Sequence, residues 1–388
     1  MKRVDPKVDE AIQTLNMKDG HTRRTLLQGT TLVSATAAAS ALLAACSSSG
    51  KANAAGSAIG NFPKTPAWQF WFVNHVTTNL FFVPTQSGFA DAAALLGIKK
   101  PKWGGSTTAL VPQMVSYMDT AIAAKADGIA TVVTTANSFT TPIASAMSAG
   151  IPVITYNADG IYQSDGTPVI GSNRLCYVGQ ALYLSGQQLG ERIVSLVPSG
   201  DVVICIATPG QGNIQPRYDG AVAAIKASGK PITVHQLATG ALTAQELAAE
   251  KAYFVGHKNT KGAFGVDAGS TELLSQALAA TNLKIPAGGF DLTPGTLSAI
   301  NSGALEFTID QEPYLQGFLP CLYMYLFNLT GGLMRPPDTD TGLTFVTKSN
   351  VGPYLTSKNS YEGSTGATKP TLVPRTGPIQ NPTATTST

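Results

Sequence analysis

Several polar side chains stand directly after short apolar runs of the chain. Asn74, His75, Asp267 and Asp291 each occupy such a position, and Arg217 stands where a helical segment begins. Carboxylates and amides exchange hydrogen bonds with polar molecules, and a guanidinium presents five donors in a rigid fork that suits two neighbouring hydroxyls. This set of residues favours binding through hydrogen bonds.

Arg217 is the strongest single candidate of this group. The dipole of a helix disfavours a cation in its first turn, so a simple surface arginine is a poor explanation for this position. Asp267 and Asp291 could pair with its guanidinium and hold three charged groups in a partly buried site. Asp291 has an alternative interpretation as a helix cap or turn former, because aspartate is common at such positions.

Residues typical of catalysis form no recognisable arrangement in the sequence. It contains no HExxH or GxSxG motif. Its four histidines, which do not cluster, are His21, His75, His235 and His257. The run 210–213 (Gly-Gln-Gly-Asn) begins like a dinucleotide-binding loop, but Gln215 stands where the third glycine belongs. We therefore predict that the chain is not an enzyme and needs no cofactor.

The four cysteines lie far apart, and none has the spacing of a zinc ligand. They are Cys46, Cys176, Cys205 and Cys321. Cys205 falls in an apolar run and Cys321 in an apolar helical segment, which favours buried free thiols. The sequence therefore predicts neither a metal site nor a disulfide framework.

Composition limits the classes of protein to which the chain can belong. Its 388 residues exceed what one hydrophobic core usually organises, so we expect two domains. Apolar residues make up 43% and charged residues 13%, as in a globular chain. The net charge is only +3, and no basic patch indicates a nucleic-acid partner.

The first 46 residues have the order of an export signal. Two arginines, at positions 23 and 24, precede an apolar run from Thr30 to Ala45. That run is shorter than the roughly 20 residues of a membrane-spanning helix. It ends in a Leu-Ala-Ala-Cys sequence similar to a bacterial lipoprotein cleavage site. We predict export by the twin-arginine route and lipidation of Cys46; an ordinary signal peptide with an incidental cysteine is the alternative.

Two further segments lack the patterns of helices and strands. Residues 47–66 are rich in Ser, Ala, Gly and Asn, and we expect them to form a flexible tether. Residues 366–388 are rich in Thr, Pro and Gly and are predicted to be a disordered tail.

From Trp68 onward, short apolar runs alternate with helical segments. Strands are predicted at 70–73, 128–133, 150–156, 201–206, 232–235, 262–266 and 287–290. Helices are predicted at 82–96, 141–149, 182–196, 218–228, 244–255, 272–280 and 314–329, and residues 119–125 are predicted to end another helix. This alternation is typical of parallel sheets with helices on both faces, and its restart near residue 182 indicates two lobes.

Seven short motifs match one protein family in the order in which that family carries them. They are Asn79-Leu80-Phe81-Phe82, Ala126-Asp127-Gly128-Ile129, Ala149-Gly150-Ile151-Pro152-Val153-Ile154-Thr155, Tyr177-Val178-Gly179, Arg217-Tyr218-Asp219-Gly220, Gly289-Phe290-Asp291 and Thr308-Ile309-Asp310-Gln311. From about residue 68 to 350 the chain thus resembles the type I periplasmic binding proteins of the ribose-binding group. The resemblance implies an α/β fold of two doubly wound parallel-sheet lobes joined by a three-stranded hinge.

The resemblance also implies where the chain crosses between the lobes. The expected crossings are near Asn157, Gln311 and Thr344. The expected N-terminal lobe comprises residues 66–157 and 312–342, and the expected C-terminal lobe comprises residues 158–311 and 343–365.

In that family a solute is held between the lobes, which close about it like a hinge. A sugar has hydroxyls at its edges and C–H groups on its faces, so its site needs polar partners and flat apolar walls. The resemblance assigns the wall to Phe81 and Phe82 and a hydroxyl contact to Asn79. The alternatives are core residues for the phenylalanines and a helix cap for the asparagine.

Further ligand contacts come from the ends of the other strands and from the hinge. Those implied by the resemblance are Asn137, Asn157, Asp159, Arg217, Asp267, Asp291 and Gln311. Asn74 and His75 directly follow the first strand, so they could also line the cleft.

The resemblance implies an extracytoplasmic protein that captures a small sugar or polyol and delivers it to an ABC importer, comprising a permease and ATPase subunits. A receptor that presents the bound sugar to a chemoreceptor or histidine kinase is the alternative, because it uses the same fold. A sugar-responsive repressor would need a helix-turn-helix where this chain has its export signal. We expect a monomer without a nucleic-acid partner, anchored by lipid on Cys46 to the outer face of the cytoplasmic membrane.

Overall fold

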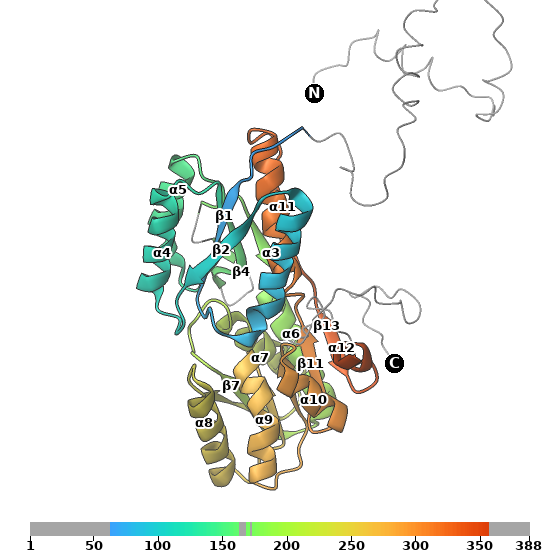
Figure 1. Cartoon of the computed structure of the whole chain (residues 1–388). Coiled ribbons are helices and arrows are strands. Elements are labelled where there is room, and N and C mark those ends of the chain that lie inside the picture. The colour runs from blue at the N-terminus through green and yellow to red at the C-terminus, as the bar shows by residue number, and fades with distance from the viewer. Residues whose placement is uncertain (1–62, 163–167, 171–172, 357–388) are drawn as a thin grey trace, which may run out of the picture. The chain divides into compact units, whose positions relative to one another are not determined.

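The structure is a computed structural model that describes residues 63–162, 168–170 and 173–356 (Figure 1). The predicted export signal, the lipidation site at Cys46, the tether up to residue 62 and the tail at 366–388 lie outside the described residues. Both lobes discussed below lie within one compact unit of the chain, which begins at Lys64.

The first lobe is built on a sheet of parallel strands, with one short antiparallel addition. Its strands are β1 (Gln69–Asn74), β2 (Lys99–Gly105), β3 (Gly128–Val133), β4 (Val153–Tyr162), β6 (Cys176–Gly179) and β12 (Thr339–Asp340). Their order is β12-β6-β4-β3-β1-β2, and β5 (Pro168–Ile170) pairs antiparallel with the end of β4. All six residues of β3 are buried, as expected for a strand with helices on both faces.

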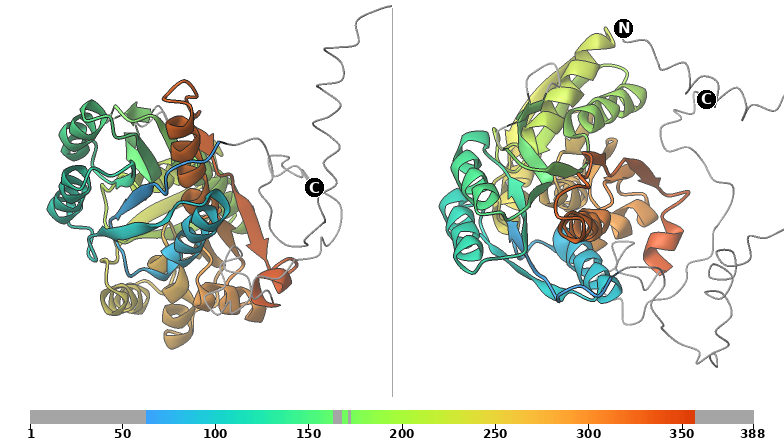
Figure 2. Two further views of the ribbon diagram at one scale, coloured as in Figure 1. Left: turned by 45° about the horizontal axis from the view of Figure 1, so that its top comes forward. Right: turned by 90° about the horizontal axis from the view of Figure 1, so that it is seen from above.

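Helices cover both faces of this sheet. They are α3 (Val83–Leu96), α4 (Val111–Ala123), α5 (Ala136–Ser148) and α11 (Leu315–Leu329), and a short 3-10 helix, η3 (Leu80–Phe82), precedes α3. Figures 1 and 2 show α4 and α5 on one side of the sheet and α3 with α11 on the other. A Cβ atom on Gly88 would lie 2.1 Å from the main-chain oxygen of Tyr314, so glycine is what allows α3 and α11 to approach closely.

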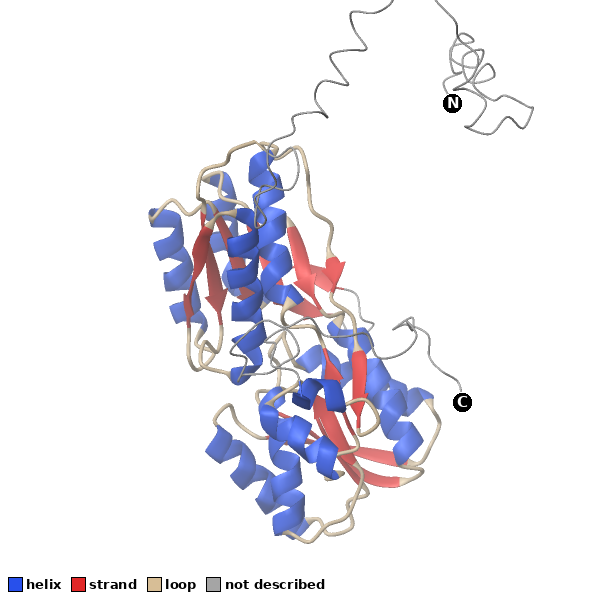
Figure 3. Cartoon of the chain, turned by 45° about the vertical axis from the view of Figure 1, so that its right-hand side comes forward, coloured by secondary structure: helices blue, strands red, loops and turns tan. Residues whose placement is uncertain are grey.

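The second lobe repeats the arrangement with a sheet of its own. Its strands are β7 (Gly200–Ile206), β8 (Ile232–Ala238), β9 (Gly262–Gly265), β10 (Ala287–Phe290), β11 (Phe307–Asp310) and β13 (Thr344–Thr347). Their order is β13-β11-β10-β9-β7-β8, and β13 is the antiparallel edge strand. The helices are α6 (Leu182–Leu196), α7 (Gln215–Ala227), α8 (Thr243–Gly256), α9 (Ala268–Ala280), α10 (Pro294–Ser302) and α12 (Gly352–Thr356). Figure 3 shows helices flanking the strands in both lobes, so the predicted fold class is confirmed.

The first crossing between the lobes differs from the expectation. Asn157 lies inside β4, and the chain then adds β6 to the same sheet, with Thr155 paired to Tyr177. The chain therefore leaves the first lobe at Gln180 rather than near Asn157. After β11 of the second sheet the chain passes through Gln311 to α11, and between β12 and β13 it passes from the first sheet to the second.

The cores are apolar and contain all three described cysteines. In the first lobe large aromatic side chains such as Phe70, Phe72 and Tyr156 are fully buried. Cys176, Cys205 and Cys321 are buried and free, which confirms the prediction for the last two.

No helix in the described ranges is long and apolar enough to span a bilayer.

Candidate functional site

A cavity of about 60 Å³ lies where carboxyl-terminal strand ends of both sheets face each other. Its lining residues are His75, Val76, Asn79, Phe81, Phe82, Asn157, Asn213, Ile214, Arg217, Asp267, Ala268, Asp291 and Gln311. Ligands of open parallel sheets bind at this end of the strands. One water needs about 10–15 Å³ of such space, so the cavity holds a few water-sized groups, on the scale of a small solute.

The structure brings most of the predicted site residues to this one cavity. Those that line it are Asn79, Phe81, Phe82, Asn157, Arg217, Asp267, Asp291 and Gln311. They come from both lobes and from three of the strand ends in the second sheet. Their contact with a ligand stays a prediction.

Arg217 is buried, with 3% of its surface exposed, in the first turn of α7. Its Nη1 donates to the main-chain oxygen of Val266 at 3.2 Å and its Nη2 to Oε1 of Gln180 at 3.2 Å. The guanidinium lies over the ring of Phe290, 4.3 Å from its centroid. Burial lowers the pKa of Arg217, while the nearby Asp291 opposes that shift. Among the described residues its Nε has no hydrogen-bond partner.

Asp267 is the N-cap of α9. Its Oδ1 accepts from the backbone N–H of Ser270 at 3.0 Å, and its Oδ2 accepts from the N–H of Ala207 at 2.8 Å. Burial raises the pKa of this carboxyl, and these hydrogen bonds and Arg217 lower it. Most of its hydrogen-bonding capacity is therefore used within the protein, although the side chain borders the cavity.

Asp291 does not cap a helix, because Thr293 caps α10 instead. Its Oδ1 accepts from Nε2 of Gln311 at 2.6 Å, and its backbone φ is +81°. Burial raises the pKa of Asp291 to about 6, against the lowering effect of Arg217 and Gln311. Neither Asp267 nor Asp291 forms an ion pair with Arg217 within the described part of the chain, so the suggested direct pairing is absent. The electrostatic attraction of each carboxylate to Arg217 therefore acts over a distance longer than a direct ion pair.

The aromatic wall stands at the start of the first lobe's helical layer. Asn79 is the N-cap of η3, where its Oδ1 accepts from the N–H of Phe81 at 2.9 Å. The rings of Phe81 and Phe82 pack edge to face at 4.7 Å, and Phe82 packs in the same way on His75 at 5.5 Å. Phe81 and Phe82 are 8% and 2% exposed, so both serve the core as well as the cavity.

Two crossings meet directly beside the cavity. Nδ2 of Asn157 donates to Oε1 of Gln316 at 3.2 Å, and Nε2 of Gln316 donates to the main-chain oxygen of Gln311 at 3.0 Å. The hydroxyl of Thr341 donates to the same oxygen at 2.8 Å. Asn157 has a φ of +64°, a conformation that asparagine tolerates better than most residues. A ligand contact at Gln311 would therefore act on the hinge itself, and a contact at Asn157 would act on it through Gln316.

Three predicted residues do not reach the cavity. Nδ2 of Asn74 donates to the hydroxyl of Tyr156 at 2.9 Å inside the first lobe. Asn137 is exposed on α5. Asp159 accepts from Nε of Arg174 at 3.2 Å, and Arg174 also pairs with Asp338. Asp159 thus belongs to an ion-pair group beside the hinge rather than to the cavity lining.

Two residues that line the cavity and one that contacts Arg217 behind it were not predicted. Asn213 and Ile214 come from the loop before α7, which the sequence singled out only as an incomplete dinucleotide loop. Gln180 lies at the first crossing, 1% exposed, and orients Arg217 while its Nε2 donates to the main-chain oxygen of Gly342 at 3.1 Å. Its position directly after the Tyr177-Val178-Gly179 motif was the available signal for Gln180.

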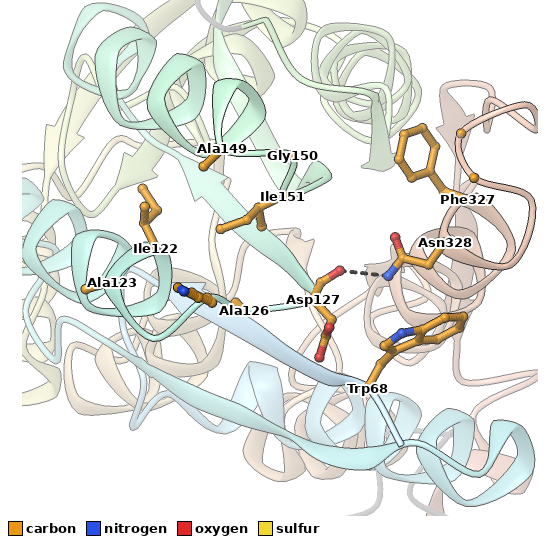
Figure 4. Close-up of a pocket in the computed structure, with 13 residues that line it drawn as sticks. Trp68, Ile122, Ala123, Ala126, Asp127, Ala149, Gly150, Ile151, Phe327 and Asn328 are labelled. Atoms are coloured by element: carbon orange, nitrogen blue, oxygen red, sulfur yellow. Dashed lines mark hydrogen bonds between the residues drawn. The ribbon is translucent and has the colours of Figure 1, made fainter. Parts of the chain in front are cut away.

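A wider hollow of about 850 Å³ lies at the strand-start end of the first lobe (Figure 4). Trp68, Asp127 and Ile151 line it just before β1, β3 and β4. Nδ2 of Asn328 donates to the main-chain oxygen of Asp127 at 2.8 Å across it. Because this edge is opposite to the one where parallel sheets bind ligands, the smaller cavity is the candidate site. The described residues contain no group of three or more His, Cys, Asp or Glu side chains suited to a metal ion.

Comparison with known proteins gives one matching family and many similar structures. The periplasmic binding protein domain matches residues 70–327. The chain is 47% identical over 326 residues to the xylose/arabinose-binding protein XylF of Sulfolobus acidocaldarius, covering 80% of this chain and 79% of that one.

Solved structures share the fold at lower sequence identity. A carbohydrate transporter from Acidothermus cellulolyticus in complex with myo-inositol is 24% identical, with a TM-score of 0.66 over 77% of this chain and 99% of that one. An ABC transporter solute-binding protein from Burkholderia graminis in complex with D-arabinose is 24% identical, with a TM-score of 0.67 over 75% and 99%. The XylFII-LytSN complex contains a chain 24% identical, with a TM-score of 0.65 over 74% and 100%. The domain match, together with the relative at 47% identity, shows that the chain belongs to the periplasmic binding protein family.

Proposed function

We propose that this solute-binding protein captures a small neutral sugar, with a pentose as the first candidate, in the 60 Å³ cavity and delivers it to an ABC importer. The cavity combines one guanidinium, two carboxylates, several amides and two phenylalanine rings. Polar edges and an aromatic wall are the two kinds of surface that a sugar needs. Solute-binding proteins of this kind are not enzymes, and the proposal includes no catalysis.

The observation that carries the proposal is the buried guanidinium of Arg217 beside the cavity. Its Nε has no hydrogen-bond partner among the described residues, and an unsatisfied buried donor costs roughly 1–3 kcal/mol. A ligand hydroxyl or ring oxygen would satisfy that donor. Because Asp267 and Asp291 balance the positive charge, a neutral ligand suits the site better than an acidic one.

The choice of a pentose rests on two supports. The relative at 47% identity is named for xylose and arabinose. The cavity is also small compared with the roughly 300–1,000 Å³ of a site for a drug-sized ligand. A polyol such as myo-inositol is the runner-up class, since it presents the same hydroxyl groups.

The family is extracytoplasmic, and the finer location belongs to the proposal. An arginine pair, an apolar run and a Leu-Ala-Ala-Cys sequence support twin-arginine export followed by lipidation of Cys46. Two or more acyl chains would hold a monomer at the membrane surface. In Cys46→Ser, fractionation of cells should find the protein released from the membrane; retention in the membrane fraction would contradict the anchor.

A thermal-shift screen of xylose, arabinose, ribose, glucose and myo-inositol tests the proposed ligand class. A ligand at 100 times its Kd stabilises the folded state by about 2.7 kcal/mol, which raises the melting temperature by several degrees. Arg217→Ala should abolish the shift, while the exposed Arg335→Ala should keep it. A full shift in Arg217→Ala would remove the central residue from the site.

A sensory role remains the second candidate, because a receptor would use the same lobes to present its sugar. Transport of radiolabelled xylose into vesicles carrying the permease and ATPase separates the two roles. Uptake that depends on this chain supports import, whereas sugar binding without any uptake supports the receptor.

A further inference from the structure

The loop between β7 and α7 bridges the two lobes. It is the segment whose Gly210-Gln211-Gly212-Asn213 run fails as a dinucleotide loop. The N–H of Gly212 donates to the main-chain oxygen of Thr134 at 2.8 Å. Thr134 directly follows β3 of the first lobe, so this backbone bond joins one lobe to the other.

Gly212 is required for space rather than for backbone freedom. A Cβ atom there would lie 2.1 Å from the main-chain oxygen of Gly160 and 3.0 Å from that of Thr134. Both atoms belong to the first lobe, and both are backbone atoms that cannot swing away. The φ angle of Gly212 is not positive, so an alanine would be tolerated by the loop itself. The clash exists only while the lobes are in contact.

The next residue adds a side-chain bond across the same boundary. Nδ2 of Asn213 lies 3.2 Å from Nε2 of His75, which follows β1. Because the amide nitrogen donates, Nε2 accepts and the proton of the neutral imidazole is on Nδ1. Burial lowers the pKa of His75 to about 4, so the ring remains an acceptor near neutral pH.

Both side chains also border the cavity, and both keep hydrogen-bonding capacity. Nδ1 of His75 and Oδ1 of Asn213 are buried, and neither has a hydrogen-bond partner among the described residues. The rings of His75 and Phe82 pack edge to face, with their centroids 5.5 Å apart, and Phe82 belongs to the cavity wall. A ligand held against that wall therefore lies beside the bond that joins the lobes.

We infer that Gly212 and Asn213 of the second lobe, with Thr134 and His75 of the first, form a latch that keeps the lobes closed over the ligand and sets its release rate. This inference rests on the proposed function for its ligand. These are positioning residues, since they act by holding two lobes together. Contacts made only in the closed state slow opening, so their removal raises the dissociation rate without weakening either lobe.

Gly212→Ala in the full chain tests the latch, with stopped-flow dissociation of xylose as the measurement. The clash should raise the dissociation rate at least tenfold, while the melting temperature without sugar stays within about one degree of the unsubstituted protein. Gly256→Ala is the matched control, because nothing lies within 4 Å of a Cβ there and its rate should not change. An unchanged rate in Gly212→Ala would overturn the latch.

A double-mutant cycle tests the side-chain bond separately. His75→Phe keeps a ring against Phe82 but cannot accept a hydrogen bond, and Asn213→Ala removes the donor. Loss of one hydrogen bond should raise the dissociation rate about fivefold in each variant. The dissociation rate of the double variant should be no higher than that of either single variant, because both substitutions remove the same bond. If the rate increases of the two single variants multiplied in the double variant, His75 and Asn213 would not be coupled.

Failure of the ligand assignment gives a different result from failure of the latch. If the unsubstituted protein binds no xylose, the proposed pentose function is wrong, and the latch is then judged by interlobe distance. Pulsed electron paramagnetic resonance between labels at Asp119→Cys and Lys258→Cys, in a Cys46→Ser background, measures that distance. The two labelled positions are exposed, whereas Cys176, Cys205 and Cys321 are buried. A longer distance in Gly212→Ala supports the latch, and an identical distribution overturns it.

Discussion

Carboxylates at equivalent positions in the sequence have different roles in the site. Asp267 and Asp291 both follow strands of the second sheet, but Asp267 caps α9 with one oxygen and accepts from the N–H of Ala207 with the other. Asp291 instead accepts a hydrogen bond from Gln311, a residue at a lobe crossing. Within the described contacts, Gln311 is the sole side chain that donates to the Asp291 carboxylate. Asp291 is therefore the carboxylate better placed to accept from a ligand hydroxyl.

Sugar affinity should depend on the ionisation of Asp291. Its pKa is raised to about 6, so the accepting carboxylate form is lost as the pH falls through 6. Between pH 7 and pH 5, isothermal titration calorimetry should show xylose affinity falling up to about tenfold. Asp291→Asn should bind more weakly at pH 7 but vary little over this range.

The other groups around the cavity limit how this result can be explained. His75 stays neutral down to about pH 4, and Arg217 stays charged throughout the range. Asp267 also has a raised pKa, so Asp267→Asn is the necessary comparison. Equal pH slopes in Asp291→Asn and in the unsubstituted protein would contradict the assignment to Asp291.

At the scale of helices, glycines fix the position of Arg217. A Cβ on Gly186 of α6 would lie 2.2 Å from the main-chain oxygen of Arg217, and one on Gly220 of α7 would lie 2.2 Å from that of Tyr183. The two helices thus pack backbone to backbone at the turn that carries the guanidinium. Any side chain at these glycines must push α7 away from α6.

Gly186→Ala should weaken both stability and sugar binding. Overpacking of this kind typically costs about 1–3 kcal/mol, and the displaced α7 would misplace Arg217. Urea denaturation should report the lost stability, and calorimetry an affinity reduced by tenfold or more. Gly352→Ala, with nothing within 4 Å of its Cβ, should change neither quantity. Full sugar affinity in Gly186→Ala would contradict the positioning role of this contact.

Helix α8 carries a buried acid that ligand binding does not use. Glu250 is fully buried, and neither of its carboxyl oxygens has a hydrogen-bond partner in the described structure. Burial, followed by the charges of Asp267 and Glu246, raises its pKa from 4.5 to about 10. The folded state therefore holds Glu250 as a neutral acid near neutral pH.

Glu250→Gln should change how stability depends on pH. Below about pH 4.5 Glu250 is protonated in both the folded and the unfolded chain, and its contribution to stability is complete. Between pH 4.5 and 10 only the unfolded chain ionises at this residue, so that contribution is lost as the pH rises. The free energy of unfolding should therefore fall, relative to Glu250→Gln, by up to about 1.4 kcal/mol per pH unit in that window. Urea denaturation at pH 5 and pH 8 measures the difference, with the exposed Glu191→Gln as control. Identical pH dependence in Glu250→Gln and the unsubstituted protein would contradict a neutral Glu250.

The central strands of both sheets could be predicted from the sequence, but an edge strand and the long-range contacts could not. Continuous apolar runs gave the central strands of both sheets, because helices cover both faces of such strands. The Lys-rich strand β2 has no such run, since it lies at the edge of its sheet. The first crossing was predicted near Asn157 but lies at Gln180. The prediction failed because the pairing of β6 with β4 is a long-range contact that no local pattern encodes. Asn213 was not predicted as a site residue for the same reason, because its partner His75 lies 138 residues away in the sequence.

For the whole molecule, the lobes, the cavity and the latch act as one device. Residues of both lobes line the cavity, and beside it Gln316 links Asn157 of β4 to the crossing at Gln311. A solute that bonds to Arg217 and Asn157 would contact both lobes at once, so it stabilises the closed arrangement. The loop at Gly212 and Asn213 adds contacts between the lobes that do not require the solute.

A crystal structure of the full chain grown with xylose tests the central claim most directly. We predict electron density for one sugar between the ring of Phe81 or Phe82 and the guanidinium of Arg217, with a hydroxyl or ring oxygen within hydrogen-bond distance of its Nε. Sugar density elsewhere, or Arg217 turned away from the bound sugar, would contradict the account.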